Sequence, residues 1–104
     1  MAKYLFVYHG GGMPETEAEQ KAVMDAWGAW FGGMGAALVD GGNPVMPSQT
    51  VQSDGSVTPD GGANPASGYS LVEADRIEDA LATAKGCPIL NAGGSVEVAE
   101  AVDM

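Results

Sequence analysis

The sequence has few cysteines and few basic residues, and both shortages exclude classes of function. Cys87 is the only cysteine among 104 residues, so no disulfide can form within the chain, which is typical of a reducing cytoplasm. Only 4 lysines and arginines stand against 14 aspartates and glutamates, which gives a formal net charge of −10. Because nucleic acids and anionic membranes are bound through clustered basic side chains, we expect neither as a partner.

Metal-ligand patterns and long apolar segments are missing as well. One histidine, His9, and one cysteine, far apart in the sequence, match no zinc pattern, and there is no calcium-binding loop. The triple glycine after His9 lacks the lysine and hydroxyl residue of a phosphate-binding loop. We therefore expect no metal and no cofactor. No segment reaches membrane-spanning length, and the first residues lack a signal peptide's apolar core, so the expected location is cytoplasmic.

What is present predicts one small domain over residues 1–104, in which 45% of the residues are hydrophobic. Tyr4–Tyr8 is aromatic and aliphatic without polar alternation, which predicts a central strand buried on both faces. Thr16 and Glu19 have the spacing of a capping box and predict that a helix begins there. The glycine-rich segment 32–35 is expected to end this helix.

The other elements follow from local patterns. They are a strand over 37–42, a hairpin around the Asp54-Gly55 turn that pairs 48–53 with 56–58, a strand over 68–73, a helix that begins at Asp75 and ends at Gly86, and a strand over 95–99. This order is the split βαβ pattern. It predicts an α+β, ferredoxin-like βαββαβ fold with an extra hairpin and with both helices on one face of an antiparallel sheet.

The second face of that sheet has no helix to cover it. Alternate residues of Tyr4–Tyr8, together with Leu71 and Val96, are expected to make this face apolar. A second copy of the same sheet would bury it. We therefore expect a homodimer.

Three stretches resemble the YCII-related family of the dimeric α/β barrel superfamily. They are the opening Lys3–Tyr8, the Asp60-Gly61-Gly62 loop with the strand Gly68–Ala74 that follows it, and the closing Gly93–Val98. The resemblance implies a ferredoxin-like subunit whose sheet packs against a partner's sheet. Members of the family are mostly uncharacterised, and some are suspected to be enzymes because a His and an Asp lie near a cleft. Two features depart from the family: Gly62-Ala63 stands where Pro-Phe is common, and Ile89 follows Pro88 where a histidine is common.

The candidate site lies where the first strand ends. His9 titrates near neutral pH and is the candidate proton donor or acceptor. The Asp60 loop leads into the strand next to the first one, so Asp60 is expected on the same side and could orient His9, with the Tyr69 hydroxyl nearby. Gly10 and Gly11 would let a small-molecule ligand approach the backbone. Each of these residues also has a purely structural interpretation, as a strand end, a turn or a core aromatic.

Two functions remain open at this stage. One is a small-ligand protein, enzymatic or not, that uses a His/Asp pair in a cleft between sheet and helices. The other is a non-catalytic ligand-binding or interaction module whose main surface use is homodimerisation. The sequence names no substrate, reaction or pathway.

Overall fold

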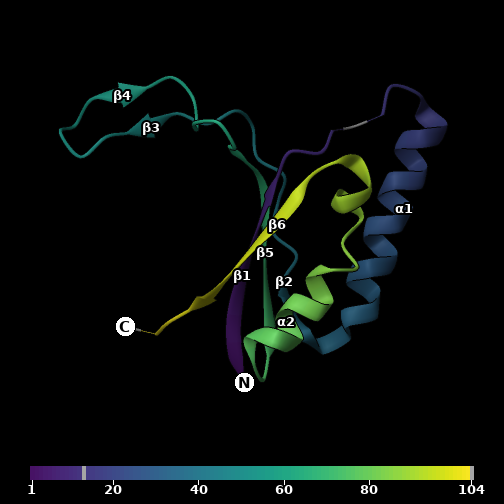
Figure 1. The fold of residues 1–104 in the computed structure, drawn as a ribbon. Coiled ribbons are helices and arrows are strands. Elements are labelled where there is room, and N and C mark those ends of the chain that lie inside the picture. Colours follow the sequence, from purple (N-terminus) through teal and green to yellow (C-terminus); the bar gives the residue numbers. More distant parts are fainter. Residues whose placement is uncertain (13, 104) are drawn as a thin grey trace.

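The computed structural model describes residues 1–12 and 14–103. Its centre is a four-stranded sheet with two helices on one face (Figure 1). The strand order is β2 (Leu38–Asp40), β5 (Ala66–Ala74), β1 (Ala2–His9), β6 (Ser95–Ala101), and every neighbouring pair is antiparallel. This is the α+β, ferredoxin-like arrangement with an extra hairpin that the sequence predicts, and that prediction is confirmed.

The first helix, α1 (Glu17–Met34), begins where the capping pattern places it. The Thr16 hydroxyl accepts a hydrogen bond from the Glu19 backbone N–H at 3.2 Å. Gly35 ends the helix with a positive φ of 57°, a conformation that glycine adopts without strain, and a short 3₁₀ helix, η1 (Gly35–Ala37), leads into β2. Trp27, Trp30 and Met34 pack against the core from this helix.

The second helix, α2 (Ile77–Ala84), starts later than predicted. Its N-cap is Arg76, whose side chain makes no capping bond, so the predicted start at Asp75 is wrong. Ala80 and Ala84 are buried against the sheet. A 3₁₀ helix, η2 (Pro88–Ala92), follows, with Pro88 in its first turn, where the missing N–H of proline is tolerated.

The core lies between the helices and one face of β1 and β5. Tyr4, Phe6 and Tyr8 are buried on that face, whereas Leu5 and Val7 between them point to the opposite face and are only partly covered. The strand is central, but the prediction that it is buried on both faces is wrong for a single chain. We call the uncovered side the open face.

The outer strand β6 corrects two further expectations. It runs to Ala101, two residues beyond the predicted end. Val96 packs against the core together with Val98, so it faces the helices and does not belong to the open face. The residues of β6 that alternate with them, Glu97 and Ala99, are exposed.

A hairpin extends from the sheet between β2 and β5. Its strands, β3 (Thr50–Val51) and β4 (Val57–Thr58), pair only with each other and are shorter than predicted. We call residues 49–60 the arm. Figure 1 shows the arm reaching away from the helices, on the side of the open face. The radius of gyration is 14.9 Å, against about 13 Å for a compact chain of this length, as a projecting segment requires.

Among residues 1–12 and 14–103, no helix combines the length and the hydropathy that crossing a lipid bilayer requires.

Candidate functional site

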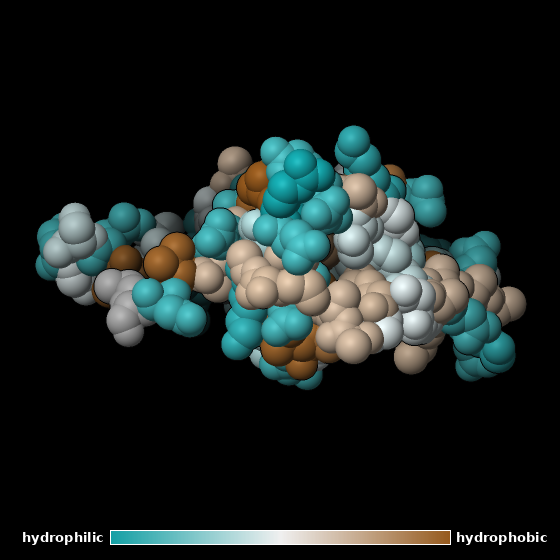
Figure 2. All heavy atoms as spheres, turned by 90° about the horizontal axis from the view of Figure 1, so that it is seen from below, coloured by the Kyte–Doolittle hydropathy of each residue, from teal (hydrophilic) through white to brown (hydrophobic). Residues whose placement is uncertain are grey.

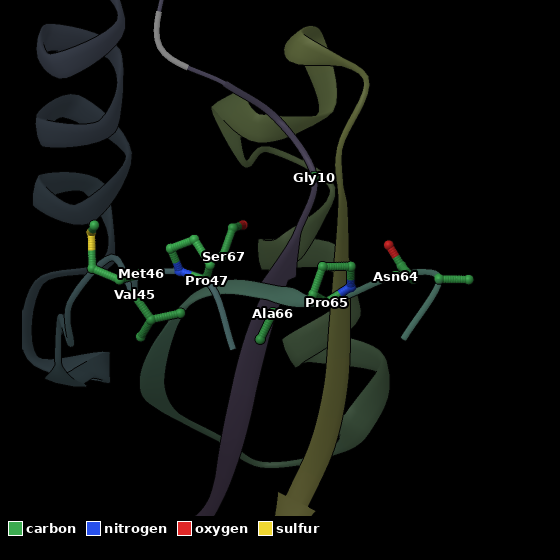
Figure 3. A pocket seen from close by; sticks show the side chains of 9 residues that line it. Gly10, Val45, Met46, Pro47, Asn64, Pro65, Ala66 and Ser67 are labelled. Atoms are coloured by element: carbon green, nitrogen blue, oxygen red, sulfur yellow. The ribbon is translucent and has the colours of Figure 1, made fainter. Parts of the chain in front are cut away.

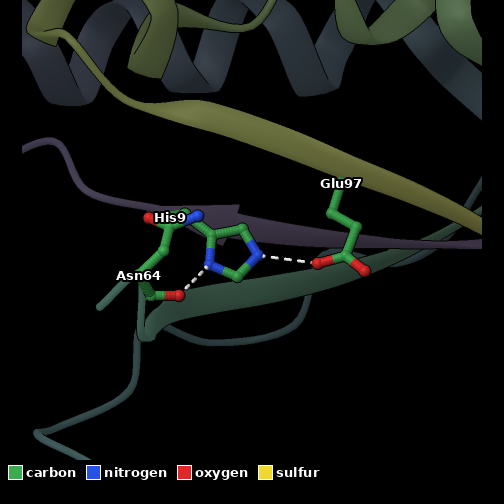
Figure 4. A network of polar contacts seen from close by, with 3 residues as sticks. All are labelled: His9, Asn64 and Glu97. Atoms are coloured by element: carbon green, nitrogen blue, oxygen red, sulfur yellow. Dashed lines mark hydrogen bonds and ion pairs between the residues drawn. The ribbon is translucent and has the colours of Figure 1, made fainter. Parts of the chain in front are cut away.

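His9 lies at the end of β1, on the open face of the sheet. The register between β1 and β6 pairs Val7 with Glu97 and His9 with Ser95, so His9 and Glu97 are diagonal neighbours on one face. The His9 Nε2 atom is 2.9 Å from Oε1 of Glu97. Figure 4 shows both side chains pointing away from the helices. The predicted location between sheet and helices is therefore replaced by one on the opposite face.

The second ring nitrogen of His9 contacts the segment that leads from the arm into β5. Nδ1 donates a hydrogen bond to the Asn64 backbone carbonyl at 2.9 Å (Figure 4). A carbonyl oxygen can only accept, and an ionised carboxylate can only accept. Both ring nitrogens therefore need a hydrogen, which is the imidazolium form.

The electrostatics agree with this geometry. The hydrogen bond to Glu97 raises the pKa of His9 above its ordinary value, and this outweighs the smaller, opposing cost of burial; the backbone carbonyls of Pro65 and Asn64 add to the rise. The His9 side chain is only 12% exposed, while that of Glu97 is 65% exposed. The arrangement favours the positive, proton-donating form of the ring at the end of the central strand.

A pocket of about 390 Å³ lies beside this network, at the base of the arm. It is formed by three crossing segments: Gly10 after β1, the stretch 45–47 after β2, and the stretch 63–67 that enters β5 (Figure 3). Asn64 both lines the pocket and binds His9. His9 itself is not a lining residue, but its chain neighbour and its bonding partner are. No lining side chain is charged.

Asp60, the expected partner of His9, is engaged elsewhere. Its carboxylate accepts a hydrogen bond from the Gly62 N–H at 2.9 Å, and its backbone carbonyl accepts one from the Thr50 hydroxyl at 2.7 Å. These bonds close the base of the arm. The carboxylate that contacts His9 belongs to Glu97 instead.

Tyr69 lies on the same open face as His9. Val7 of β1 pairs with Tyr69 of β5 on one side and with Glu97 of β6 on the other. Val7 therefore lies between Tyr69 and Glu97. The Tyr69 hydroxyl accepts a hydrogen bond from the Asn43 side-chain amide at 3.2 Å. Tyr69 therefore shares the face with His9 and Glu97 but bonds toward β2.

The two candidate glycines differ in their surroundings. Both have a positive φ, 71° at Gly10 and 70° at Gly11. Gly10 lines the pocket. A side chain at Gly11 would come within 2.8 Å of Ile89, so close packing against η2 already accounts for that glycine.

Two other kinds of chemistry, metal binding and thiol catalysis, would depend on His, Cys, Asp and Glu side chains of residues 1–12 and 14–103. No group of three or more His, Cys, Asp or Glu side chains is placed to hold a metal ion among those residues. Cys87 is 1% exposed, and burial raises the pKa of its thiol to about 11. Burial and a raised thiol pKa are typical of a packing residue.

Sequence reasoning missed Glu97 and Asn64. Glu97 alternates with Val96 and Val98 in the last strand, a pattern that marks it as pointing away from the core. That signal gives a face but no partner. Asn64 contributes only its backbone carbonyl, which no side-chain pattern reveals.

Comparison with known proteins gives a fold relationship. No protein-family model and no curated protein matches the sequence. A solved structure that resembles this chain is 5-chloro-2-hydroxyhydroquinone dehydrochlorinase (TftG) from Burkholderia phenoliruptrix AC1100, in complex with 2,5-dihydroxybenzoquinone. The TM-score is 0.56 over 96% of this chain and 95% of that one, with 16% sequence identity. The likeness shows a shared fold.

Proposed function

We propose that this chain is a small-ligand protein whose site lies at the end of β1. The pocket at the base of the arm would hold the ligand, and protonated His9 would supply a charged hydrogen bond, or a proton, at its rim. The observation that carries the proposal is the His9 ring, bonded through both nitrogens to acceptors and joined through Asn64 to the pocket. Histidine held in a defined protonation state beside a pocket is a common feature of ligand and proton-transfer sites.

Because no side chain that lines the pocket is charged, the pocket favours a small ligand with few polar atoms, each of which would meet one polar group of the protein. The related fold was solved with 2,5-dihydroxybenzoquinone, a planar ring that carries oxygen atoms. An oxygen of such a ring could accept the hydrogen bond that His9 now donates to Glu97 or to the Asn64 carbonyl. We propose this ligand class, oxygen-substituted planar rings, as the first to test.

The direct experiment measures binding of 2,5-dihydroxybenzoquinone by isothermal titration calorimetry. A hydrogen bond to a charged group contributes about 1.5–3 kcal/mol, so His9→Gln should weaken binding at least about tenfold. Lys21→Gln is the matched control, because it breaks a similar 2.9 Å ion pair, with Asp25, on exposed α1. The proposal is wrong if the wild-type chain does not bind, or if both variants bind equally well with folding intact.

A second candidate is a non-catalytic binding module, and one observation favours it. Both ring nitrogens of His9 already have partners, so the ring could serve only to fasten the segment after the arm to the sheet. In that case His9→Gln would lower the stability of the chain and leave ligand affinity unchanged. Chemical denaturation of the same variants separates the two candidates.

We also propose that the open face is the interface of a homodimer. Leu5 and Tyr69 are each 36% exposed there and Val39 is 42% exposed, while the helices cover only the other face. Sheet-to-sheet packing should bury at least about 1,000 Å² in total. Sedimentation velocity at micromolar concentration should show a dimer that Leu5→Asp dissociates and Met24→Asp, on the exposed side of α1, does not. A monomer throughout that range would contradict the proposal.

A further inference from the structure

The arm is too small to be stable by its own contacts. Its strands contain two residues each and form a separate two-stranded sheet. Its turn closes through the backbone bonds Gly55 N–H to Gln52 O at 2.9 Å and Gln52 N–H to Ser56 O at 2.7 Å. An isolated two-stranded hairpin is at best marginally stable in water. A hairpin of this kind needs a surface to pack on.

The arm has two unlike faces. On one, the Gln52 amide donates to the Thr58 hydroxyl at 2.8 Å, and the Thr50 hydroxyl donates to the Asp60 carbonyl at 2.7 Å. On the other, Val51 and Val57 form a directly opposed cross-strand pair. These valines are 70% and 58% exposed. The side chains of the polar face bond to groups of the arm itself, while the apolar face is left uncovered by residues 1–12 and 14–103.

The position of the arm restricts what can cover it. It leaves the sheet on the side opposite the helices (Figure 1), and Figure 2 shows it protruding from one end of the body with apolar residues among polar ones. Val45 and Met46, at the arm's base, are also exposed, at 41% and 83%. Anything that covers the open face of the sheet therefore lies alongside the arm.

We propose that the apolar face of the arm, Val51 and Val57, packs against a second copy of this chain. The inference rests on the proposed dimer, in which the partner's sheet already occupies the side toward which the arm projects. Because a two-fold axis relates the copies, each arm contacts the other subunit, and one interface includes one sheet-to-sheet contact and two arm contacts. Val51 and Val57 are uncharged, so the contact that they would make with the partner is apolar.

A second copy would also connect the arm to the candidate site. The segment that returns from the arm contains Asn64, which binds His9. An arm held by the partner would hold that segment in place beside the pocket. Dimerisation and the shape of the ligand site would then be coupled through the few residues between β4 and Asn64.

The decisive measurement is an isotope-filtered NOE experiment on dimers mixed from methyl-labelled and unlabelled chains. The Val51 and Val57 methyl groups should show contacts to protons of the unlabelled chain, and Val102, 73% exposed near the chain's end, serves as an internal comparison. A dimer without such contacts overturns the arm proposal and leaves the sheet interface standing. A chain that stays monomeric overturns the dimer and the arm together.

Substitutions give an independent readout through the dimer dissociation constant. Val51→Asp should raise it at least about tenfold, since a desolvated methyl pair is replaced by a charge. Val51→Thr, which keeps the shape and strand propensity, should raise it less. Ser53→Asp adds the same charge to the same hairpin outside the valine pair and should leave it unchanged. Equal effects of Val51→Asp and Ser53→Asp would refute the contact.

Discussion

A buried hydroxyl chain joins β1, β5 and the residue that follows β2, and its removal gives a sharp prediction. The Tyr8 hydroxyl donates to the Ser70 hydroxyl at 2.7 Å, and the Ser70 hydroxyl donates to the Gly41 carbonyl at 2.7 Å. Ser70 is fully buried, and Tyr8 is 5% exposed. Burial raises the pKa of Tyr8 to about 12, although the bond to Ser70 acts in the opposite direction. The phenol is therefore neutral and available as the donor.

The magnitudes follow from which groups lose a partner. Ser70→Ala leaves the Tyr8 hydroxyl and the Gly41 carbonyl unpaired, and we expect it to lower the free energy of unfolding by about 2–3 kcal/mol. Tyr8→Phe removes the donor but leaves Ser70 bonded to Gly41, so its cost should be about 1 kcal/mol. In the double variant the unpaired phenol no longer exists. The double variant should therefore be no less stable than Ser70→Ala alone, which is a coupling of about 1 kcal/mol or more.

Urea unfolding followed by tryptophan fluorescence measures the free energy of unfolding of the wild-type chain, the two single variants and the double variant. Trp27 packs edge-on against Tyr8 with ring centroids 4.9 Å apart, so the signal reports on this region. The protein concentration must be the same throughout, since dimerisation would make stability concentration-dependent. If the free-energy losses of the two single variants simply add in the double variant, the proposed network is refuted. Tyr8→Phe being costlier than Ser70→Ala would refute it too.

Two further predictions concern the ionisable groups. Glu97→Gln should lower the pKa of His9 toward its ordinary value, seen in an NMR titration of the only imidazole; an unchanged titration would contradict the ion pair. Because the His9 pKa is raised by folding, its stabilisation is complete below about pH 6.5, the unfolded value, and is lost as pH rises through the folded pKa. The wild-type chain should lose more stability across that window than the Glu97→Gln variant. Cys87, buried and with its pKa raised to about 11, should react with a thiol reagent at pH 8 only after unfolding, and rapid modification of the native protein would contradict this.

Much of the fold could be predicted because its signals are local. The Thr16–Glu19 spacing marks a helix start, Asp54-Gly55 marks a hairpin turn, and the order of elements allows few sheets. Predictions went wrong where a residue's environment depends on neighbours far along the chain. Tyr4–Tyr8 has no polar residue on either face, but only the face toward α1 and α2 is covered within one chain. The apolar Leu5 and Val7 are the part of that pattern that the proposed dimer would explain.

The site shows the same limit more clearly, because its composition depends on strand register. His9 could be singled out as the only histidine, at a strand end followed by glycines. The carboxylate that contacts His9 could not be identified, because the sequence alone does not show whether Asp60 or Glu97 lies beside it. The register of β1 with β6 places Glu97 diagonal to His9 across 88 positions of sequence, and a shift of one residue would turn Glu97 to the helix side. Asp60 is instead occupied by the Gly62 amide in a tight turn, the ordinary use of an aspartate before glycines. Since the apolar partners Val96 and Val98 fix which face of β6 is buried, the core itself determines which carboxylate His9 meets.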